Sequence, residues 1–488
     1  MRVLIEPPWQ DWRLGPGPGS PAPGSPGATG GRDELAACCA RPPRGVAPVP
    51  PAAGGEGATR PPLGASTRIV ATGHQAWLWH PGVLAKYIAA AEAARRLGAV
   101  PLAVVVDHDV HDALRLELPV RQSDRLSVVR GDLAPSVANV PAGAQRPADP
   151  EDVLHTLRSL RDASTAGAAG VQTLIDAWTG LPASSSLADQ VALVLARLMR
   201  PYVGAMAMVH ASDLMELAPA QALLARMLAE ARRCAQAYNQ AVAQHPHAGI
   251  EPLSISPELV ELPLWRWTAG SPRRRVYADL TSSVSIFVTA DGQAIDPGAL
   301  KPDEHLAPRA LLLTGLMRWA FCDLFIHGRG GAIYDQVTQQ WWRLWTSAPL
   351  APDTVVSADL FLPLDAPVAG ADELAHAQWW AHHLPHNIDR VAADLAGEPQ
   401  DWARRKGTLL AHMEDDRDRV RRAGSFAQLH ELNRALAQAR PQLLAQAQQQ
   451  LDRARVGLAN RALAARRDWC FALYPPAQLA ELAAAIRA

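Results

Sequence analysis

The alternation of apolar runs and polar turns between residues 68 and 112 predicts a strand, a helix and a second strand. RIVAT is apolar and rich in β-branched residues, and Gly73 ends it. Apolar residues then recur at helical spacing from Leu84 to Ala91, and Pro81 suits the first turn of this helix. AVPLAVVVD follows as a continuous apolar run, which is typical of a parallel strand buried on both faces. The unit is expected to form a right-handed crossover in an open α/β sheet.

The same apolar periodicity extends the α/β pattern to about residue 370. Edge strands are predicted at LRLELPV and RLSVV. A helix is predicted at LADQVALVLARLMRPYV, and a further buried strand at VGAMAMVHASD. One long helix is expected from Pro219 to Gln244, followed by a small β section formed by LVELPLWRW, RVYADL and SVSIFVTADG. APRALLLTGLMRWAF then predicts a helix, DLFIHG a short strand, GRGGAIYDQ a turn that opens a helix, and VVSADLFLP a last strand.

After about Glu373 the pattern is helical to the end of the sequence. Leucines repeat at heptad spacing, and their phase slips by one residue near Pro441, which predicts a helix break or a stutter there. Three arrangements remain open: an antiparallel helical hairpin with DWARRKGTLLAHMEDDRDRVRRAG as the opposing arm, a coiled coil that makes a dimer, and an ordinary helical subdomain.

The N-terminal part has a different composition. From Gly15 to about Ser66 the chain is rich in Pro, Gly and Ala and has few large apolar residues, so we expect disorder over residues 1–66, with a short strand at Met1 to Ile5 as the exception considered. The sequence therefore predicts three parts. They are this segment, an α/β core over residues 67–370 with an insertion around 118–300, and a helical domain over 371–488.

Composition and charge narrow the class of protein. The formal net charge of −1 argues against broad electrostatic binding to nucleic acid or to an anionic membrane. The five cysteines contain no CxxC pair and fit a reducing, cytoplasmic setting, with Cys322 as a buried core residue. MRVLIEPPWQDWRLG lacks the pattern of a secretory signal. ALLLTGLMRWAFCDLFI is interrupted by Arg318 and Asp323, which predicts a buried helix instead of a membrane span. The tryptophans, Trp265 among them, are expected to be packing anchors.

The first candidate site is TGHQAWLWHPG, at the turn between the first strand and its helix. A glycine turn before a helix N-terminus offers free backbone N–H groups and a partial positive charge, which suit a phosphate. Its two histidines could donate to that phosphate or transfer protons, or they could only cap the turn. The expected binding residues are Thr72, Gly73, Gln75, His80 and Lys86, with His74 as the catalytic residue.

The second candidate site is DHDVHD, directly after the second strand. Such a cluster could bind a divalent metal, form a substrate or nucleotide site without metal, or be a polar loop held by local turn bonds. In an extended segment Asp107 and Asp109 share a face, with His108 opposite. We expect these three residues to be catalytic, and no residue is assigned as a metal ligand.

The third candidate site is HGRGGAIYDQ. Its glycines let the backbone approach a ligand closely, and Arg329 could pair with a carboxylate or phosphate. The alternative is a tight turn that needs positive φ. The expected binding residues are Gly328, Arg329, Gly330, Tyr334 and Asp335.

Taken together, these segments resemble the bacillithiol-biosynthesis cysteine-adding enzymes, a family of cysteine ligases. That family has a GQQ-type turn before a GP-containing helix, then an apolar strand ending in a DHD-type motif; here these are TGHQAWLWHPG and VVVDHD. Its SPN-type helix start and GGPGEIAYW-type turn are matched by APRALLLTGLMRW and HGRGGAIYDQ, and its ELP-type strand by LVELPLW. The similarity runs from Arg68 to the C-terminus. The chain departs from the family at His74, which replaces Gln, at Gly331 and Ala332, where a Glu is absent, and at Asp335, which replaces Trp.

The resemblance implies a Rossmann-like parallel sheet with inserted connecting regions, and a C-terminal α-helical coiled-coil domain that forms a homodimer. It implies an enzyme that joins cysteine, or a related amino acid, to an amino-sugar malate-type acceptor through an amide bond. The residues alone assign no cofactor and leave open whether ATP is consumed; the resemblance implies a nucleotide, ATP or ADP, because a free carboxylate is a poor acyl donor. The alternatives are a nucleotide-dependent transferase with another substrate, a metal-dependent hydrolase and a non-catalytic dimeric scaffold.

Overall fold

A computed structural model describes residues 1–15, 31–40, 64, 67–135, 137–164, 167–387 and 399–488. The chain divides into two compact units. The first comprises Met1–Leu118, Val129–Leu362 and Arg467–Ala488, and the second comprises Pro119–Val128 and Pro363–Arg466.

The first unit is built on a mixed sheet in which five neighbouring strands are parallel, in the order β6-β3-β2-β12-β13. A sixth strand, β1, pairs antiparallel with β13 at the edge. The bounds are β1 Arg2–Glu6, β2 Ile69–Gln75, β3 Val100–Val106, β6 Ala207–His210, β12 Leu324–His327 and β13 Asp353–Asp359. The central strands are continuous apolar runs because both faces of the sheet are covered. The predicted α/β class with a parallel sheet is confirmed.

The order of the strands creates a switch point between β2 and β12. From β2 the chain moves outward to β3 and then β6 on one side, whereas β12 and β13 lie on the other side. Thr72 ties the two central strands together, since its Oγ1 donates to the Ile326 carbonyl at 2.8 Å across 254 positions of sequence. In open α/β sheets, ligands bind in the crevice beyond the carboxyl ends of the strands at such a point.

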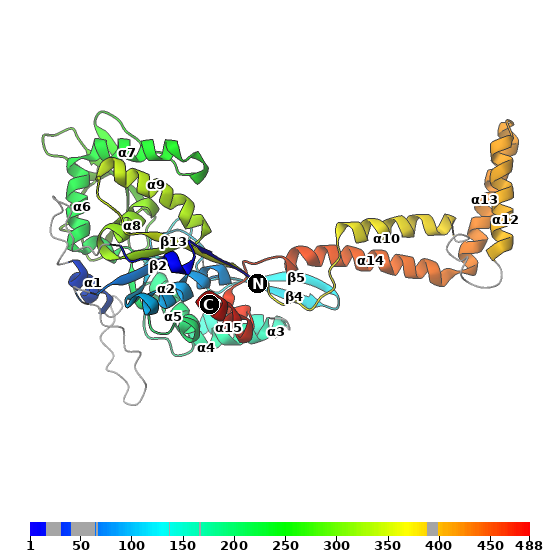
Figure 1. Ribbon diagram of the computed structural model, residues 1–488, viewed down its shortest axis with the longest axis horizontal. Coiled ribbons are helices and arrows are strands. Elements are labelled where there is room, and N and C mark those ends of the chain that lie inside the picture. Colours follow the sequence, from blue (N-terminus) through cyan, green and yellow to red (C-terminus); the bar gives the residue numbers. More distant parts are fainter. Residues whose placement is uncertain (16–30, 41–63, 65–66, 136, 165–166, 388–398) are drawn as a thin grey trace. The chain divides into compact units, whose positions relative to one another are not determined.

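Helices cover both faces of this sheet. Figure 1 shows α2 on one face and α8 and α9 on the other. Three fully buried tryptophans, Trp341, Trp342 and Trp345, fill the core under α9. The bounds are α1 Gly31–Ala40, α2 Pro81–Leu97, α3 Pro150–Ala163, α4 Ala168–Trp178, α5 Leu187–Val203, α6 Ala218–Ala229, α7 Ala231–Gln244, α8 Ala310–Leu316, α9 Arg329–Trp345 and α15 Pro476–Arg487.

A separate antiparallel sheet forms part of the first unit, with the order β10-β9-β8-β7-β11. Its strands are β7 Leu259–Thr268, β8 Arg274–Asp279, β9 Ile286–Thr289, β10 Ala294–Ile295 and β11 Glu304–Pro308. This is the predicted small β section. The two predicted edge strands form the hairpin β4 Arg115–Gln122 and β5 Arg125–Asp132.

The second unit is mainly helical, with α10 Ala371–His383, α12 Pro399–Asp415, α13 Arg419–Ala439 and α14 Pro441–Ala464. Helix α10 packs on α14 through Ala377, Leu451 and Ala454, and α12 packs on α13. The helix break predicted at Pro441 is confirmed. The hairpin tip is held to this unit by the buried Asn460, whose Oδ1 accepts from the Leu126 N–H at 2.8 Å and whose Nδ2 donates to the Asp124 carbonyl at 2.6 Å.

The prediction of disorder over residues 1–66 is wrong for Arg2–Glu6 and Gly31–Ala40. The first forms β1, and the second forms α1, which buries Leu35. A long-range ion pair also holds α1, because Arg32 Nη2 lies 2.9 Å from Asp323 Oδ2 in the interior. Residues 7–15 are also described, with a short 3-10 helix at Trp9–Asp11, and so is residue 64, whereas residues 16–30, 41–63 and 65–66 lie outside the described residues.

Two boundaries also differ from those predicted. The helical domain does not extend over 371–488, because Arg467–Ala488 belongs to the first unit, where α15 packs on α2 and buries Leu482 and Ile486. The single helix expected from Pro219 to Gln244 is two helices, α6 and α7, because the backbone leaves helical geometry at Glu230. Among the described helices, none is long and apolar enough to cross a membrane.

Candidate active site

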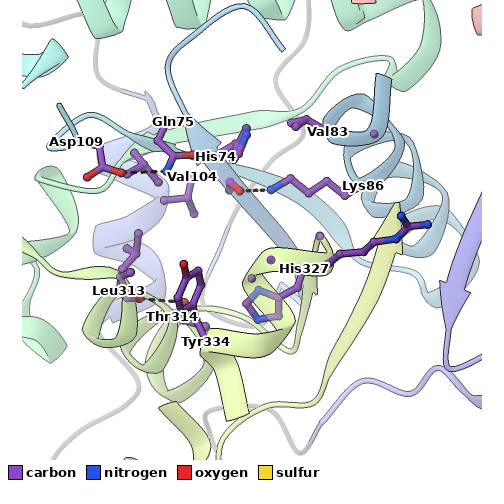
Figure 2. Close-up of a pocket in the computed structure, with 18 of the residues that line it drawn as sticks. His74, Gln75, Val83, Lys86, Val104, Asp109, Leu313, Thr314, His327 and Tyr334 are labelled. Carbon is purple, nitrogen blue, oxygen red and sulfur yellow. Dashed lines mark hydrogen bonds between the residues drawn. The ribbon is translucent and has the colours of Figure 1, made fainter. Parts of the chain in front are cut away.

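A cavity of about 770 Å³ lies at the carboxyl ends of β2, β3 and β12, where the sheet has its switch point. Figure 2 shows its walls, with side chains from these strand ends and from the first turns of α2 and α9. All three segments singled out in the sequence therefore contribute to one site. The predicted residues that line it are Gly73, His74, Gln75, His80, Lys86, His108, Asp109, Gly328, Arg329, Gly330 and Tyr334.

Three predicted site residues, Thr72, Asp107 and Asp335, do not line the cavity. Thr72 is buried between the strands, and Asp335 is buried in an ion network described below. Asp107 accepts hydrogen bonds from the backbone N–H of Ser212, at 3.2 Å, and from its hydroxyl. Each of the three therefore has a structural partner in place of a ligand-facing position.

The expectation that Asp107 and Asp109 share a face, with His108 opposite, is wrong. His108 and Asp109 line the cavity, whereas Asp107 faces Ser212 beyond the end of β6. The alternation of side chains holds only while the backbone is extended, and β3 ends at Val106, before these residues begin.

His74 presents an imidazole to the cavity that has no hydrogen-bond partner among the described residues. Its ring meets the Trp77 ring edge-on, with the two ring centroids 5.3 Å apart. Burial, and then the charges of Lys86, His80 and His111, hold the pKa of His74 well below its usual range. At neutral pH the ring is therefore uncharged and can accept a proton from a substrate.

His80 is the N-cap of α2, and its Nδ1 accepts from the Gly82 N–H at 3.1 Å. Because Nδ1 is an acceptor, a neutral His80 ring carries its proton on Nε2. Burial, and then the charge of Arg467, lower the pKa of His80. The capping alternative thus applies to His80, although its ring also lines the cavity.

Lys86 projects from α2 into the cavity and is the only cation that α2 contributes to the described cavity wall. Its Nζ donates to the carbonyl oxygen of Gly73, just beyond Thr72, where the pairing of β12 with β2 ends. Burial lowers the pKa of Lys86 to about 7. A large fraction of this amine is therefore uncharged at neutral pH.

The wall opposite α2 is held by Asp109. Its carboxylate accepts from Gln75 Nε2 at 2.9 Å and from Arg273 Nη1 at 2.8 Å. The guanidinium groups of Arg273 and Arg309 both contact the ring of Trp265, at 4.2 and 4.3 Å from its centroid. Trp265 is thus more than the packing anchor predicted from sequence, since it lines the cavity between two arginines.

The first turn of α9 is open to the cavity. Its N-cap is Gly328, which has no side chain to accept from the first N–H groups of the helix. Added Cβ atoms at Gly328 and Gly330 would meet nothing within 4 Å, whereas one at Gly331 would lie 2.8 Å from the His327 ring. The unmatched N–H groups and the helix dipole make this turn suitable for an anion. The positive φ considered for this turn is not found.

Below the cavity, His327, Asp335 and Asp353 offer ligand atoms within 4.8 Å of one another, a geometry that could hold a metal ion. Arg318 already provides a positive charge there: it pairs with Asp335 and lies 3.0 Å from Asp353 Oδ1. Burial, with the charge of Asp335 in addition, raises the pKa of Asp353 despite Arg318. The residues fit a buried ion network better than a metal centre, because the guanidinium is already paired with both carboxylates.

Sequence reasoning missed several cavity residues, namely Trp265, Arg273, Arg309, His327, Arg467 and Asp468. A signal existed for His327, which begins the segment HGRGGAIYDQ. The others come from the antiparallel sheet, the loop before α8 and the segment after α14. No local sequence pattern predicts that these three segments lie near β2.

Cys322 is buried, as predicted, and burial raises its pKa far above the usual range. No protein-family model matches the chain, and no curated protein matches it either.

Proposed function

We propose that this chain is an enzyme that binds an anionic small molecule in the cavity and joins an amine to a carboxylate through an amide bond. The observation that carries the proposal is the convergence of the β2–α2 turn, the end of β3 and the β12–α9 turn on one cavity. These are the segments that resemble cysteine ligases. The strand order β6-β3-β2-β12-β13 supports a Rossmann-like assignment, since it matches the order 3-2-1-4-5 of nucleotide-binding sheets.

The charge of the wall supports an anionic ligand. Basic side chains outnumber acidic ones among the described lining residues: Lys86, Arg273, Arg309, Arg329 and Arg467 against Asp109 and Asp468. Glu261 and Asp359 pair with three of the arginines from behind the wall and hold them in place. Oriented guanidinium groups and an open helix N-terminus together provide recognition for a phosphate or carboxylate.

The proposed chemistry assigns a role to each wall. The neutral His74 imidazole accepts the proton of the attacking amine, and the α9 turn with Arg329 holds the phosphates of ATP or ADP. A nucleotide, when bound, activates the carboxylate by giving it a better leaving group. Asp109 orients the amine or hydroxyl groups of the acceptor. Cysteine and an amino-sugar malate conjugate are the substrates proposed, on the resemblance described above.

The test is calorimetric titration of the full chain with ATP, ADP and cysteine. We expect saturable binding of a nucleotide that weakens about tenfold in Arg329→Met, as expected for loss of one charge-assisted contact. Arg343→Met is the matched control, because Arg343 is exposed near the other end of α9 and should leave binding unchanged. Folded protein that binds none of the three compounds would overturn the proposal.

We also propose a homodimer through the helices of the second unit. The leucine repeat supports it, and so do large apolar side chains that are exposed on α12 and α13, namely Leu410, Val420 and Phe426. Light scattering after size exclusion measures the mass, and a dimer that Val420→Glu with Phe426→Glu converts to monomer is the expected result. A monomeric wild-type chain contradicts this proposal without touching the enzymatic one.

A further inference from the structure

The amine of Lys86 is buried in the cavity and has no acidic partner in the described part of the chain. Lys86 is 6% exposed, and the hydrogen bond that Nζ donates within the described residues goes to a neutral acceptor, the Gly73 carbonyl. Among the described residues, no carboxylate lies within ion-pair distance of Nζ. An unpaired ammonium in such a place is costly, whereas the neutral amine is not.

The choice of lysine at this position is informative in a chain that otherwise uses arginine. Only three of the 47 basic Lys and Arg residues are lysines, Lys86, Lys301 and Lys406. Arginine would supply a cation to the same cavity, but its guanidinium does not lose its proton and is not a nucleophile. Lysine alone of the two can offer an uncharged nitrogen lone pair.

The groups around Lys86 favour that uncharged form and can move protons. His74 at the end of β2 and His80 before α2 interact with its charge, and neither is an anion that would stabilise an ammonium. The Tyr87 ring, whose centroid lies 5.8 Å from Nζ, offers the ammonium a cation–π contact, but this contact is at the limit of its range and burial outweighs it. Burial lowers the pKa of Lys86 to about 7. The other titratable or charged groups that line the described wall nearest α2 and α9 are His327, Arg329, Tyr334, Arg467 and Asp468.

We propose that Lys86 is a nucleophile that condenses with the carbonyl carbon of an aldehyde or ketone bearing a phosphate or carboxylate group. The amine nitrogen adds to the carbonyl carbon and gives a carbinolamine. Loss of the carbonyl oxygen as water, with both protons of the amine, leaves an imine between Nζ and the former carbonyl carbon. The step needs no oxidant or reductant, and neutral histidines on the wall are suited to transfer its protons.

The anionic group of this compound is assigned from the arginines and the open turn of α9. This part rests on the same lining as the proposed function, whereas the nucleophilic amine does not. Binding of a nucleotide and formation of an imine can therefore succeed or fail independently, and the experiment separates them.

The test treats the full chain with pyridoxal 5′-phosphate, reduces the imine with sodium borohydride and maps the modified lysines by peptide mass spectrometry. We expect saturable labelling of Lys86 at pH 7, roughly tenfold or more faster than of the exposed Lys301, because burial lowers the pKa of Lys86 to about 7 and the cavity can hold the phosphate beside it. The labelling rate of Lys86 should level off above pH 7.

Two comparisons make the outcome decisive. Lys301→Arg should retain the labelling and Lys86→Arg should lose it, with circular dichroism to show that both are folded. Pyridoxal without phosphate should react at least about tenfold more slowly at Lys86, as expected for loss of a charge-assisted contact. Equal labelling of the two lysines overturns the proposal, and so do equal rates with pyridoxal and its phosphate. Nucleotide binding without labelling of Lys86 overturns the imine proposal but leaves the proposed ligase function unaffected.

Discussion

The helices α2 and α9 begin at the same cavity after neighbouring parallel strands, and each has 17 residues, yet their first turns are built in opposite ways. The turn before α2 is closed, because the His80 ring caps the Gly82 N–H. The turn before α9 is open, because Gly328 leaves its N–H groups without a side-chain acceptor. One strand–turn–helix pattern can therefore give either a rigid wall that presents side chains or a receptor for an anion.

The two helices are also anchored differently. Lys86 ties α2 to the neutral carbonyl of Gly73, whereas the carboxylate of Asp335 ties α9 to the buried guanidinium of Arg318. A charged anchor is costly to break, since the remaining carboxylates stay buried without a partner. The contrast leads to four predictions.

The largest effect is expected from Arg318→Met, which leaves Asp335 and Asp353 without their cation. We expect the free energy of unfolding to fall by about 3–5 kcal/mol, measured by urea denaturation. Arg343→Met, an exposed position of α9, should change it by less than about 0.5 kcal/mol. A similarly small change in Arg318→Met would show that the ion network does not anchor α9.

The next effect separates the two turns. Gly82→Ala should destabilise the chain by about 1–3 kcal/mol, because the new Cβ would lie 2.9 Å from the Ala358 carbonyl oxygen and 2.8 Å from the His80 ring. Gly330→Ala has open space and a helical position, and should stabilise by about 0.5–1 kcal/mol. Thermal unfolding of both variants checks this, and equal shifts in the same direction would remove the distinction.

A change in binding is expected from Gly328→Asp. The N-cap backbone is already extended, so the new carboxylate can accept from the first N–H groups of α9. Anion affinity should then fall about tenfold or more while stability rises by a few tenths of a kcal/mol. Calorimetry with ADP measures the first and urea denaturation the second. Undiminished affinity would place the anion away from this turn.

The smallest effect concerns His210, at the end of β6. Burial lowers its pKa, but the hydrogen bond to Asp189 and the nearby charges of Asp107 and Asp213 outweigh it, so the pKa is raised. Its contribution to stability is therefore present below the unfolded value of about 6.5 and is lost as pH rises through the folded pKa. Urea midpoints should fall as the pH rises above about 6.5, less so in His210→Gln. His376→Gln, at an exposed position, should keep the full slope.

Local patterns were enough to predict the elements that carry most of the site. Both β2 and β3 lie where their apolar runs predicted them, and so does the glycine-rich turn that opens α9. Because the strand ends of a parallel sheet converge, His74, Asp109 and Arg329 share the cavity. The roles of Asp107 and Asp109 could not be separated, because that depends on where β3 stops and on Ser212, a residue of another loop.

Other features depend on long-range packing. The helix α1 has one large apolar side chain, Leu35, and is held through Arg32 by Asp323, 291 positions away. Arg273 and Arg309 reach the cavity only because the antiparallel sheet docks there, and Trp265 orders both. Such contacts have no periodic signature in the chain, so composition alone misassigned the N-terminal segment and left this wall unassigned.

The return of the chain to the first unit at Arg467 has a consequence for biosynthesis. The residues that open the cavity, from Gly73 onward, leave the ribosome early, whereas Arg467 and Asp468 of the same wall follow only after the whole second unit has been made. The wall is therefore incomplete throughout translation of the helical segment. A nascent chain can fold most of its parallel sheet and still lack a finished binding site, so any activity begins only after the last part of this wall has been synthesised.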